Sequence, residues 1–221
     1  MSPDGTALGL AIANVHDVFA GMAANPDEVG CLACYSPGDM EMLRRSDVPV
    51  PDDLVASVAL EVPDHWDDHA AVLRRVLPQA VDKLVLNSLD HGLTASRLVA
   101  AGWTEWPEEQ VAAIRQFLGA WWDWSLRQES PPTKIWDVFE CCATATSEVT
   151  TWLARWDAAA AIDTNARRAL AECFDWWWYD LQAGVSPFHW WHDARERAAS
   201  DELNTWLART RHGVPNADDG R

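Results

Sequence analysis

Apolar residues recur at three- and four-residue steps along most of the chain, the spacing that places side chains on one face of an α-helix. Two segments show this pattern most clearly. The first has apolar residues at Ile135, Val138, Phe139, Cys142, Ala145, Val149, Trp152 and Trp156. The second has them at Val111, Ile114, Phe117, Leu118 and Trp121. No segment shows the strict apolar–polar alternation and β-branched enrichment of strands, so the pattern predicts an all-α protein.

The breaks between periodic segments fall at proline, glycine and asparagine residues and predict seven to nine helices. The helical segments cover residues 7–24, 37–45, 51–60, 65–87, 93–101, 107–126, 133–157, 164–182 and 187–207. Pro78 removes one helical hydrogen bond and predicts a kink or break near Val76. Gly102 is expected to cap the fifth segment, and Ser186-Pro187 to open the last.

Long amphipathic helices joined by short connections pack as antiparallel neighbours. The expected architecture is therefore a multi-helix bundle or a short α-solenoid of stacked helical hairpins. Residues 1–211 are expected to form a single helical domain, and the polar segment 212–221 a flexible tail. The pentapeptide Thr-Trp-Leu-Ala-Arg occurs at 151–155 and again at 205–209, and a single recurrence does not establish a repeat.

Tryptophan is the most unusual feature of the composition, with 15 residues against seven Phe and Tyr combined. Two aromatic runs, at 121–124 and 176–179, cover most of a helix circumference, so their rings cannot all face one core. These helices are either buried on several sides or present an aromatic surface to a partner helix, a peptide or an apolar ligand. The predicted partner-binding residues are Trp121, Trp122, Trp124, Trp176, Trp178, Trp190 and Trp191.

The formal net charge of −17 predicts a surface that repels phosphate, so direct nucleic-acid contact and binding to an anionic membrane are not expected. No apolar run reaches the roughly 18 residues of a membrane span. The N-terminus has no basic leader and does not resemble a secretory signal. Five cysteines, an odd number, fit a reducing compartment. We therefore expect a cytoplasmic protein.

Cys31 and Cys34 have the spacing of half a tetrahedral zinc site, because two thiolates on one tight turn reach the same ion. His65 and His69 are four residues apart, which on a helix places both imidazoles on one face among carboxylates. The alternative is that the cysteines are small apolar loop residues and that the histidines belong to a solvated first helical turn. These four residues are the candidate metal ligands. No cofactor is expected, and zinc is the alternative.

Several motifs are shared with a known group of proteins. They are Gly30-Cys31-Leu32-Ala33-Cys34, Leu77-Pro78, the AGWTEWP segment at 101–107, and Ala120-Trp121-Trp122. In these motifs, over residues 15–126, the chain resembles an uncharacterised family of Trp-rich, all-helical bacterial proteins with an N-terminal cysteine cluster. The resemblance implies an all-α fold and no known activity. Members carry a Gly-Cys-x-Cys-Cys-type cluster, whereas this chain has two cysteines there, which weakens an inherited metal role.

The chain has no Gly-rich phosphate loop, no G-x-S-x-G elbow and no Cys/His pair in a nucleophile context. The preferred hypothesis is therefore a non-catalytic interaction or scaffold protein that binds a protein partner, or a second copy of itself, through Trp-rich helix faces. The alternative is a zinc-binding protein or zinc-dependent enzyme that uses Cys31, Cys34 and His. A third hypothesis is a small-molecule carrier with a Trp-lined cavity of at least about 300 Å³.

Overall fold

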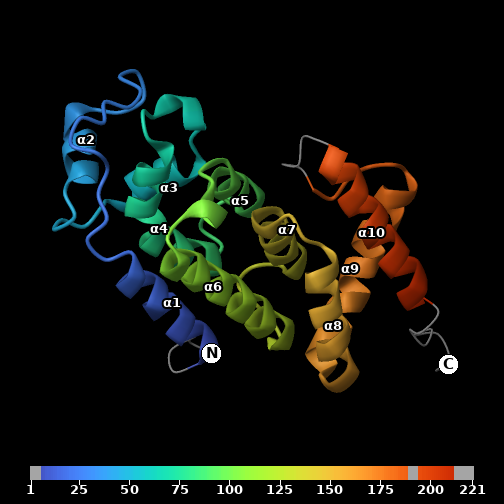
Figure 1. Ribbon diagram of the computed structural model, residues 1–221. Helices are drawn as coiled ribbons and strands as arrows, with labels where there is room; N and C mark the ends of the chain where they lie inside the picture. The colour runs from blue at the N-terminus through green and yellow to red at the C-terminus, as the bar shows by residue number, and fades with distance from the viewer. Residues whose placement is uncertain (1–5, 189–193, 212–221) are drawn as a thin grey trace.

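The chain folds into ten α-helices and two short 3-10 helices, with no strand, in a computed structural model that describes residues 6–188 and 194–211 (Figure 1). The first six α-helices are α1 (Ala7–Val18), α2 (Pro37–Arg44), α3 (Asp52–Leu60), α4 (His69–Val85), α5 (His91–Ala100) and α6 (Glu108–Arg127). The others are α7 (Ile135–Thr146), α8 (Thr150–Ile162), α9 (Thr164–Gln182) and α10 (Ala194–Arg211). The 3-10 helices are η1 (Pro63–His65) and η2 (Trp103–Glu105). The all-α prediction is confirmed, and the predicted number of helices was too low.

The additional helix arises because residues 133–157 form two helices, α7 and α8, where the apolar pattern predicted one. Ser147 adopts the left-handed conformation, with φ of 55°, and a residue in that conformation ends a helix. The apolar residues beyond the break, Val149, Trp152 and Trp156, are all buried. The apolar periodicity therefore continues from α7 into α8 and does not indicate where one helix ends and the next begins.

Three other predicted boundaries can be compared with the structure. Helix α4 continues through Pro78 to Val85, so no break occurs there. Gly102 has the left-handed conformation, with φ of 64°, directly after α5, which confirms it as the cap. Ser186 and Pro187 do not open the last helix: they lie in the turn after α9, where the Ser186 hydroxyl accepts a hydrogen bond from the Phe188 N–H. The predicted tail, 212–221, lies outside the described residues.

Helices from distant parts of the sequence share one core. Helix α1 packs along α6, α5 packs on α7, and α3 packs on α4. Helices α8, α9 and α10 lie at one end of the molecule and α2 and α3 near the other, with α5, α6 and α7 between them (Figure 1). The buried apolar residues form one cluster that extends from Leu8 to Leu207. The pairing of α1 with α6 differs from a solenoid, in which each repeat contacts only its neighbours in sequence.

Tryptophan rings connect the helices at the centre of this core. Trp122 of α6 contacts Phe139 of α7 and Trp156 of α8, with ring centroids 5.8 and 5.3 Å apart. Trp156 in turn contacts Trp177 of α9 at 6.0 Å and Trp206 of α10 at 5.5 Å. Its indole N–H donates to the carbonyl of Ala166 at 3.0 Å, which satisfies the one polar atom of a buried ring. Phe139 of α7 also lies 6.5 Å from Trp156, so five helices meet at this ring.

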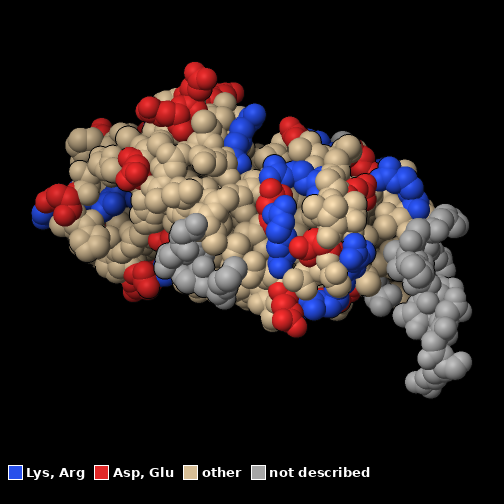
Figure 2. All heavy atoms as spheres, turned by 90° about the horizontal axis from the view of Figure 1, so that it is seen from below, with Lys and Arg blue, Asp and Glu red and all other residues tan. Residues whose placement is uncertain are grey.

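Charged side chains of both signs are interspersed on the face shown in Figure 2, where Lys and Arg gather over the C-terminal helices beside Asp and Glu. Two ion pairs join these helices to their neighbours. Arg155 of α8 bonds Asp123 of α6 at 2.7 Å, and Arg209 of α10 bonds Asp157 of α8 at 2.9 Å. That face presents no uninterrupted basic surface. Among the described helices, none is long and apolar enough to cross a membrane.

Two histidines of the described chain are buried, and burial lowers the pKa of both. His69 begins α4, where the charge of Arg97 lowers its pKa further. His91 begins α5, and its Nε2 lies 3.2 Å from the carbonyl oxygen of Leu84. In both cases desolvation is the largest cause, so the folded protein favours neutral imidazoles.

We predict that Trp122→Ala lowers the free energy of unfolding by about 3–5 kcal/mol, because it opens a cavity where α6, α7 and α8 meet. Trp176→Ala removes an indole that is 59% exposed and stacked on Trp136 at 5.5 Å, so its cost is at most about 1.5 kcal/mol. Urea unfolding followed by far-ultraviolet circular dichroism measures both. Equal losses for the two variants would show that Trp122 has no central place in the core.

We also predict that stability falls as pH decreases below about 6.5, the ordinary pKa of histidine. The pKa values of His69 and His91 are lower in the folded state, so the unfolded chain binds more protons in this range and is favoured by acid. Urea titrations between about pH 5.5 and 7.5, above the ordinary pKa values of carboxyl groups, measure the slope. The double variant His69→Gln/His91→Gln should have a smaller slope, and an unchanged slope would rule out these histidines as its source.

Candidate metal centre

Three of the predicted metal ligands converge in the structure: Cys31, Cys34 and His65. Their ligand atoms all lie within 4.8 Å of one another, and no other group of three His, Cys, Asp or Glu side chains in the described chain meets this condition. The cysteines come from the turn before α2, and the histidine from η1, some 30 residues later. The sequence spacing identified the two thiols, and the fold supplies the imidazole.

The distances agree with a tetrahedral ion. With Zn–S of about 2.3 Å and Zn–N of about 2.0–2.1 Å, a tetrahedral site separates sulfur and nitrogen by about 3.6 Å and two sulfurs by about 3.8 Å. The Sγ atom of Cys34 lies 3.5 Å from Nδ1 of His65. The sulfur of Cys31 completes a triangle whose edges are all below 4.8 Å. The one edge with an individual distance thus matches a tetrahedral site, and the upper bound on the other two is about 1 Å above the tetrahedral values.

The cysteine turn is fixed by its own backbone. The N–H groups of Cys34 and Tyr35 both donate to the carbonyl of Cys31, at 2.9 and 3.0 Å, which brings the two thiols to the same side. Ser36 then caps α2 in a reciprocal hydrogen-bonded arrangement with Asp39. The turn is therefore anchored at its C-terminal end by a helix start.

Gly30 allows the turn to approach the histidine loop. It has φ of 63°, and a Cβ atom there would lie 3.0 Å from Met40 Sδ and 3.1 Å from the Trp66 ring. Trp66 directly follows His65, and its ring centroid lies 4.4 Å from that of Tyr35, which directly follows Cys34. The residues beside each ligand are thus packed on one another, which holds the two ligand segments together.

A carboxylate stands beside the three ligands. Glu61 Oε1 lies 3.2 Å from Nδ1 of His65, the same nitrogen that faces Cys34. Its Oε2 accepts a hydrogen bond from the Tyr35 hydroxyl at 3.4 Å, and that hydroxyl accepts one from Ser57 at 3.2 Å. A carboxylate is a known fourth zinc ligand. The sequence analysis did not single out Glu61. Its Oε1 lies closer to Nδ1 of His65 than the sulfur of Cys34 does.

The two thiols of the turn differ in acidity. The interaction between the two thiol side chains lowers the pKa of Cys31 and raises that of Cys34. Cys31 is therefore the thiol that ionises first and the first to be available as a thiolate ligand. Burial raises the pKa of the other three cysteines, Cys141, Cys142 and Cys173.

His69 does not join the site, and the prediction that it shares a helical face with His65 is wrong. His65 ends η1, whereas His69 begins α4, so the backbone between them is not one continuous helix. The imidazole of His69 is buried, and neither ring nitrogen has a hydrogen-bond partner. It is a core residue at a helix start.

The structure also places the predicted partner-binding tryptophans. Trp121 and Trp122 are completely buried and cannot contact a partner, which corrects that part of the prediction. Trp124 and Trp178 are partly buried against the core, and Trp190 and Trp191 lie outside the described residues. Trp176 alone among the described members of this set is exposed, at 59%. Most indoles at these positions therefore fill the spaces between helices.

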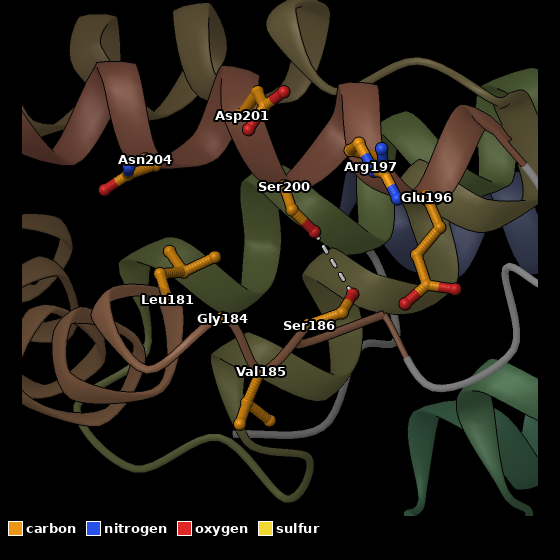
Figure 3. Close-up of a pocket in the computed structure, with 9 residues that line it drawn as sticks. All are labelled: Leu181, Gly184, Val185, Ser186, Glu196, Arg197, Ser200, Asp201 and Asn204. Carbon is orange, nitrogen blue, oxygen red and sulfur yellow. Dashed lines mark hydrogen bonds between the residues drawn. The ribbon is translucent and has the colours of Figure 1, made fainter.

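A surface pocket of about 440 Å³ lies between the end of α9 and α10 (Figure 3). The hydroxyl groups of Ser186 and Ser200 form a hydrogen bond of 3.1 Å across it, and Glu196 and Arg197 lie on its α10 side. No histidine or cysteine is among the described residues that line it.

A larger cleft of about 730 Å³ has tryptophans in its wall, as the carrier hypothesis requires. Trp136 and Trp176 stack beside it with ring centroids 5.5 Å apart, and Asp90 and Asp180 also line it. The exposure of Trp176 shows that the cleft is open to solvent, so it is not the enclosed cavity that was expected. The carrier hypothesis stays a prediction.

No protein-family model, curated protein or solved structure matches the chain. The resemblance to a bacterial helical family therefore rests on the shared motifs alone.

We predict that alkylation by iodoacetamide near pH 7.5 modifies Cys31 of the reduced, metal-free protein before Cys34. Cys34 is the more exposed of the two, but the thiolate is the nucleophile, and the pKa of Cys31 is the one that is lowered. Cys141, Cys142 and Cys173 should react only after unfolding, because they are buried. A time course analysed by peptide fragmentation distinguishes the two sites. If Cys34 reacts first, exposure rather than acidity controls the pair.

Proposed function

We propose that this protein binds a divalent transition-metal ion, with zinc as the favoured ion, through Cys31, Cys34 and His65. The observation that carries the proposal is the convergence of three ligand atoms, from two segments of the chain, within 4.8 Å of one another. A tetrahedral site has this size. Glu61 is the proposed fourth ligand: its Oε1 lies 3.2 Å from Nδ1 of His65, and its carboxylate has to move toward the two sulfurs to reach the ion.

The donor set favours zinc. Thiolate sulfur and imidazole nitrogen suit zinc, whereas calcium and magnesium take oxygen ligands. Both cysteines coordinate as thiolates, so metal binding releases the protons that the thiols carry in the metal-free protein. The site therefore binds more tightly as pH rises through the range in which these thiols ionise.

The proposed role of the ion is to fasten the N-terminal loops to the helices behind them. The segment between α1 and α2 carries the cysteines and has 18 residues without regular helix, from Phe19 to Ser36. A metal bound to this segment and to η1 closes a long loop, which stabilises the folded state by constraining the unfolded one. With four protein ligands the site is closed and serves structure, whereas with three it keeps one position open to water. We assign no catalytic role to a residue beside it.

Partner binding through aromatic side chains is a second proposal with narrower support. Among the described candidates it rests on Trp176, and the neighbouring Tyr179 is 74% exposed. The proposed partner is a second copy of the chain or another protein.

The metal proposal is tested by titrating the reduced protein with cobalt(II) and then displacing it with zinc. We expect one equivalent to bind with the charge-transfer band of thiolate ligands and the intense visible bands of tetrahedral cobalt. The Cys31→Ser/Cys34→Ser double variant should lose more than about 100-fold in affinity, beyond the 10–100-fold effect of outer-shell groups. Glu61→Gln should lose less than the double variant and keep the thiolate band.

The matched control is His16→Gln, which removes a half-exposed histidine that pairs with Asp82 at 3.0 Å, away from the ligand loops. Its cobalt affinity should equal that of the wild type. A wild-type protein that binds no cobalt, or a double variant that binds it equally well, would contradict the proposal.

A further inference from the structure

Glu28 is a buried carboxylate in the loop that precedes the cysteine turn. Its side chain lies in a surface loop, yet the residue is only 1% exposed. Its Oε1 accepts hydrogen bonds from the N–H groups of Gly30 and Asp67, at 3.1 and 2.9 Å. Its Oε2 accepts one from the N–H of Asp68 at 2.8 Å. One carboxylate therefore serves three backbone donors from two separate loops.

These three donors stand next to the metal ligands. Gly30 directly precedes Cys31, and Asp67 is two residues beyond His65. A shift of either loop moves a ligand with it, because each bonded amide belongs to a residue that is one to three positions from a ligand. Glu28 thus connects the backbone that carries the thiols to the backbone that carries the imidazole.

The Glu28 carboxylate and the backbone N–H groups stabilise each other. A buried carboxylate is costly unless its oxygens accept hydrogen bonds, and buried backbone N–H groups are costly unless an acceptor is present. Here each side satisfies the other, with charge-assisted bonds that are stronger than those between neutral groups. The Glu28 carbonyl also accepts a bond from Nε of Arg44 at 3.1 Å, which ties the same residue to α2.

Two more hydrogen bonds join the loops outside this buried contact. The side-chain amide of Asn25 donates to Asp68 Oδ2 at 3.0 Å, and the N–H of Val29 donates to Asp67 Oδ2 at 3.2 Å. Both are exposed to solvent, where a single hydrogen bond contributes less. Glu28 is the buried member of the set and the one that bonds to both loops.

We propose that Glu28 is a positioning residue that sets the metal affinity of the Cys31–Cys34–His65 site by holding its two ligand loops together before the ion binds. This inference rests on the proposed metal-binding function. A site whose ligands are already in place loses less conformational freedom on binding, so it binds more tightly. Glu28 does not touch the ion and acts only through the loops.

The test compares cobalt affinity in Glu28→Gln with that of the wild type, both in reduced form. Glutamine keeps the size of the side chain but has only one accepting oxygen, so its NH₂ group faces one of the three N–H donors. We expect a 10- to 100-fold loss of affinity, the range for groups that orient metal ligands. At saturating cobalt the spectrum should match the wild type, because the three ligands are unchanged.

Asp163→Ala is the matched control, because it removes a helix N-cap that accepts two backbone hydrogen bonds. Asp163 is also a carboxylate that accepts backbone N–H bonds, from Asn165 at 2.7 Å and Ala166 at 3.2 Å, but at the start of α9. This variant should lower the melting temperature and leave the cobalt affinity unchanged. It separates a loss of general stability from a loss of loop positioning.

Asn25→Ala is a milder variant for the case in which Glu28→Gln does not fold. It removes one exposed bond between the same loops and should lower the affinity two- to fivefold without preventing folding. Amide hydrogen exchange of the metal-free proteins provides a second readout, with faster exchange expected at Gly30, Asp67 and Asp68 in Glu28→Gln.

The outcomes distinguish this inference from the function beneath it. If the wild type binds cobalt and the affinity of Glu28→Gln is within about threefold of the wild-type value, the positioning role is wrong and the metal site stands. If Glu28→Gln does not fold, an unchanged affinity in Asn25→Ala has the same meaning. A wild-type protein that binds no cobalt overturns the metal site and this inference with it.

Discussion

The hydrogen bonds between Glu28 and three backbone N–H groups hold the candidate site together. Loops cannot satisfy their own backbone as helices do, and two loops that bury part of it need an acceptor from elsewhere. The carboxylate of Glu28 meets this need for Gly30, Asp67 and Asp68 at once. The ligands Cys31 and His65 are placed as a consequence. The chemistry of the site thus depends on a residue that does not take part in it.

The helical framework behind the loops depends on bulky indole rings that fill the spaces between helices. The apolar periodicity predicted the helices well, because every amphipathic helix must bury one face. It did not predict the break at Ser147, because a left-handed serine leaves the apolar spacing on both sides unchanged. It also overestimated the exposed aromatic surface: Trp121 and Trp122 are adjacent on α6, and the structure buries both among surrounding helices.

The site was predicted in part. The spacing of Cys31 and Cys34 identified the two thiols, because a short turn alone brings them together. His65 was chosen through a helical spacing to His69 that the fold does not form. Glu28 was not found, because its bonds join residues some 40 positions apart and the sequence has 34 acidic residues with no spacing to distinguish this one. Contacts between loops follow from the packing of helices, which local sequence does not encode.

The most direct test of the metal centre is X-ray absorption spectroscopy at the zinc edge of the protein loaded with one equivalent of zinc. The account predicts a first coordination shell of two sulfur atoms at about 2.3 Å and two nitrogen or oxygen atoms at about 2.0–2.2 Å. A shell of six oxygen or nitrogen atoms without sulfur would contradict it. So would a shell of four sulfur atoms, which requires cysteines that the fold keeps buried elsewhere.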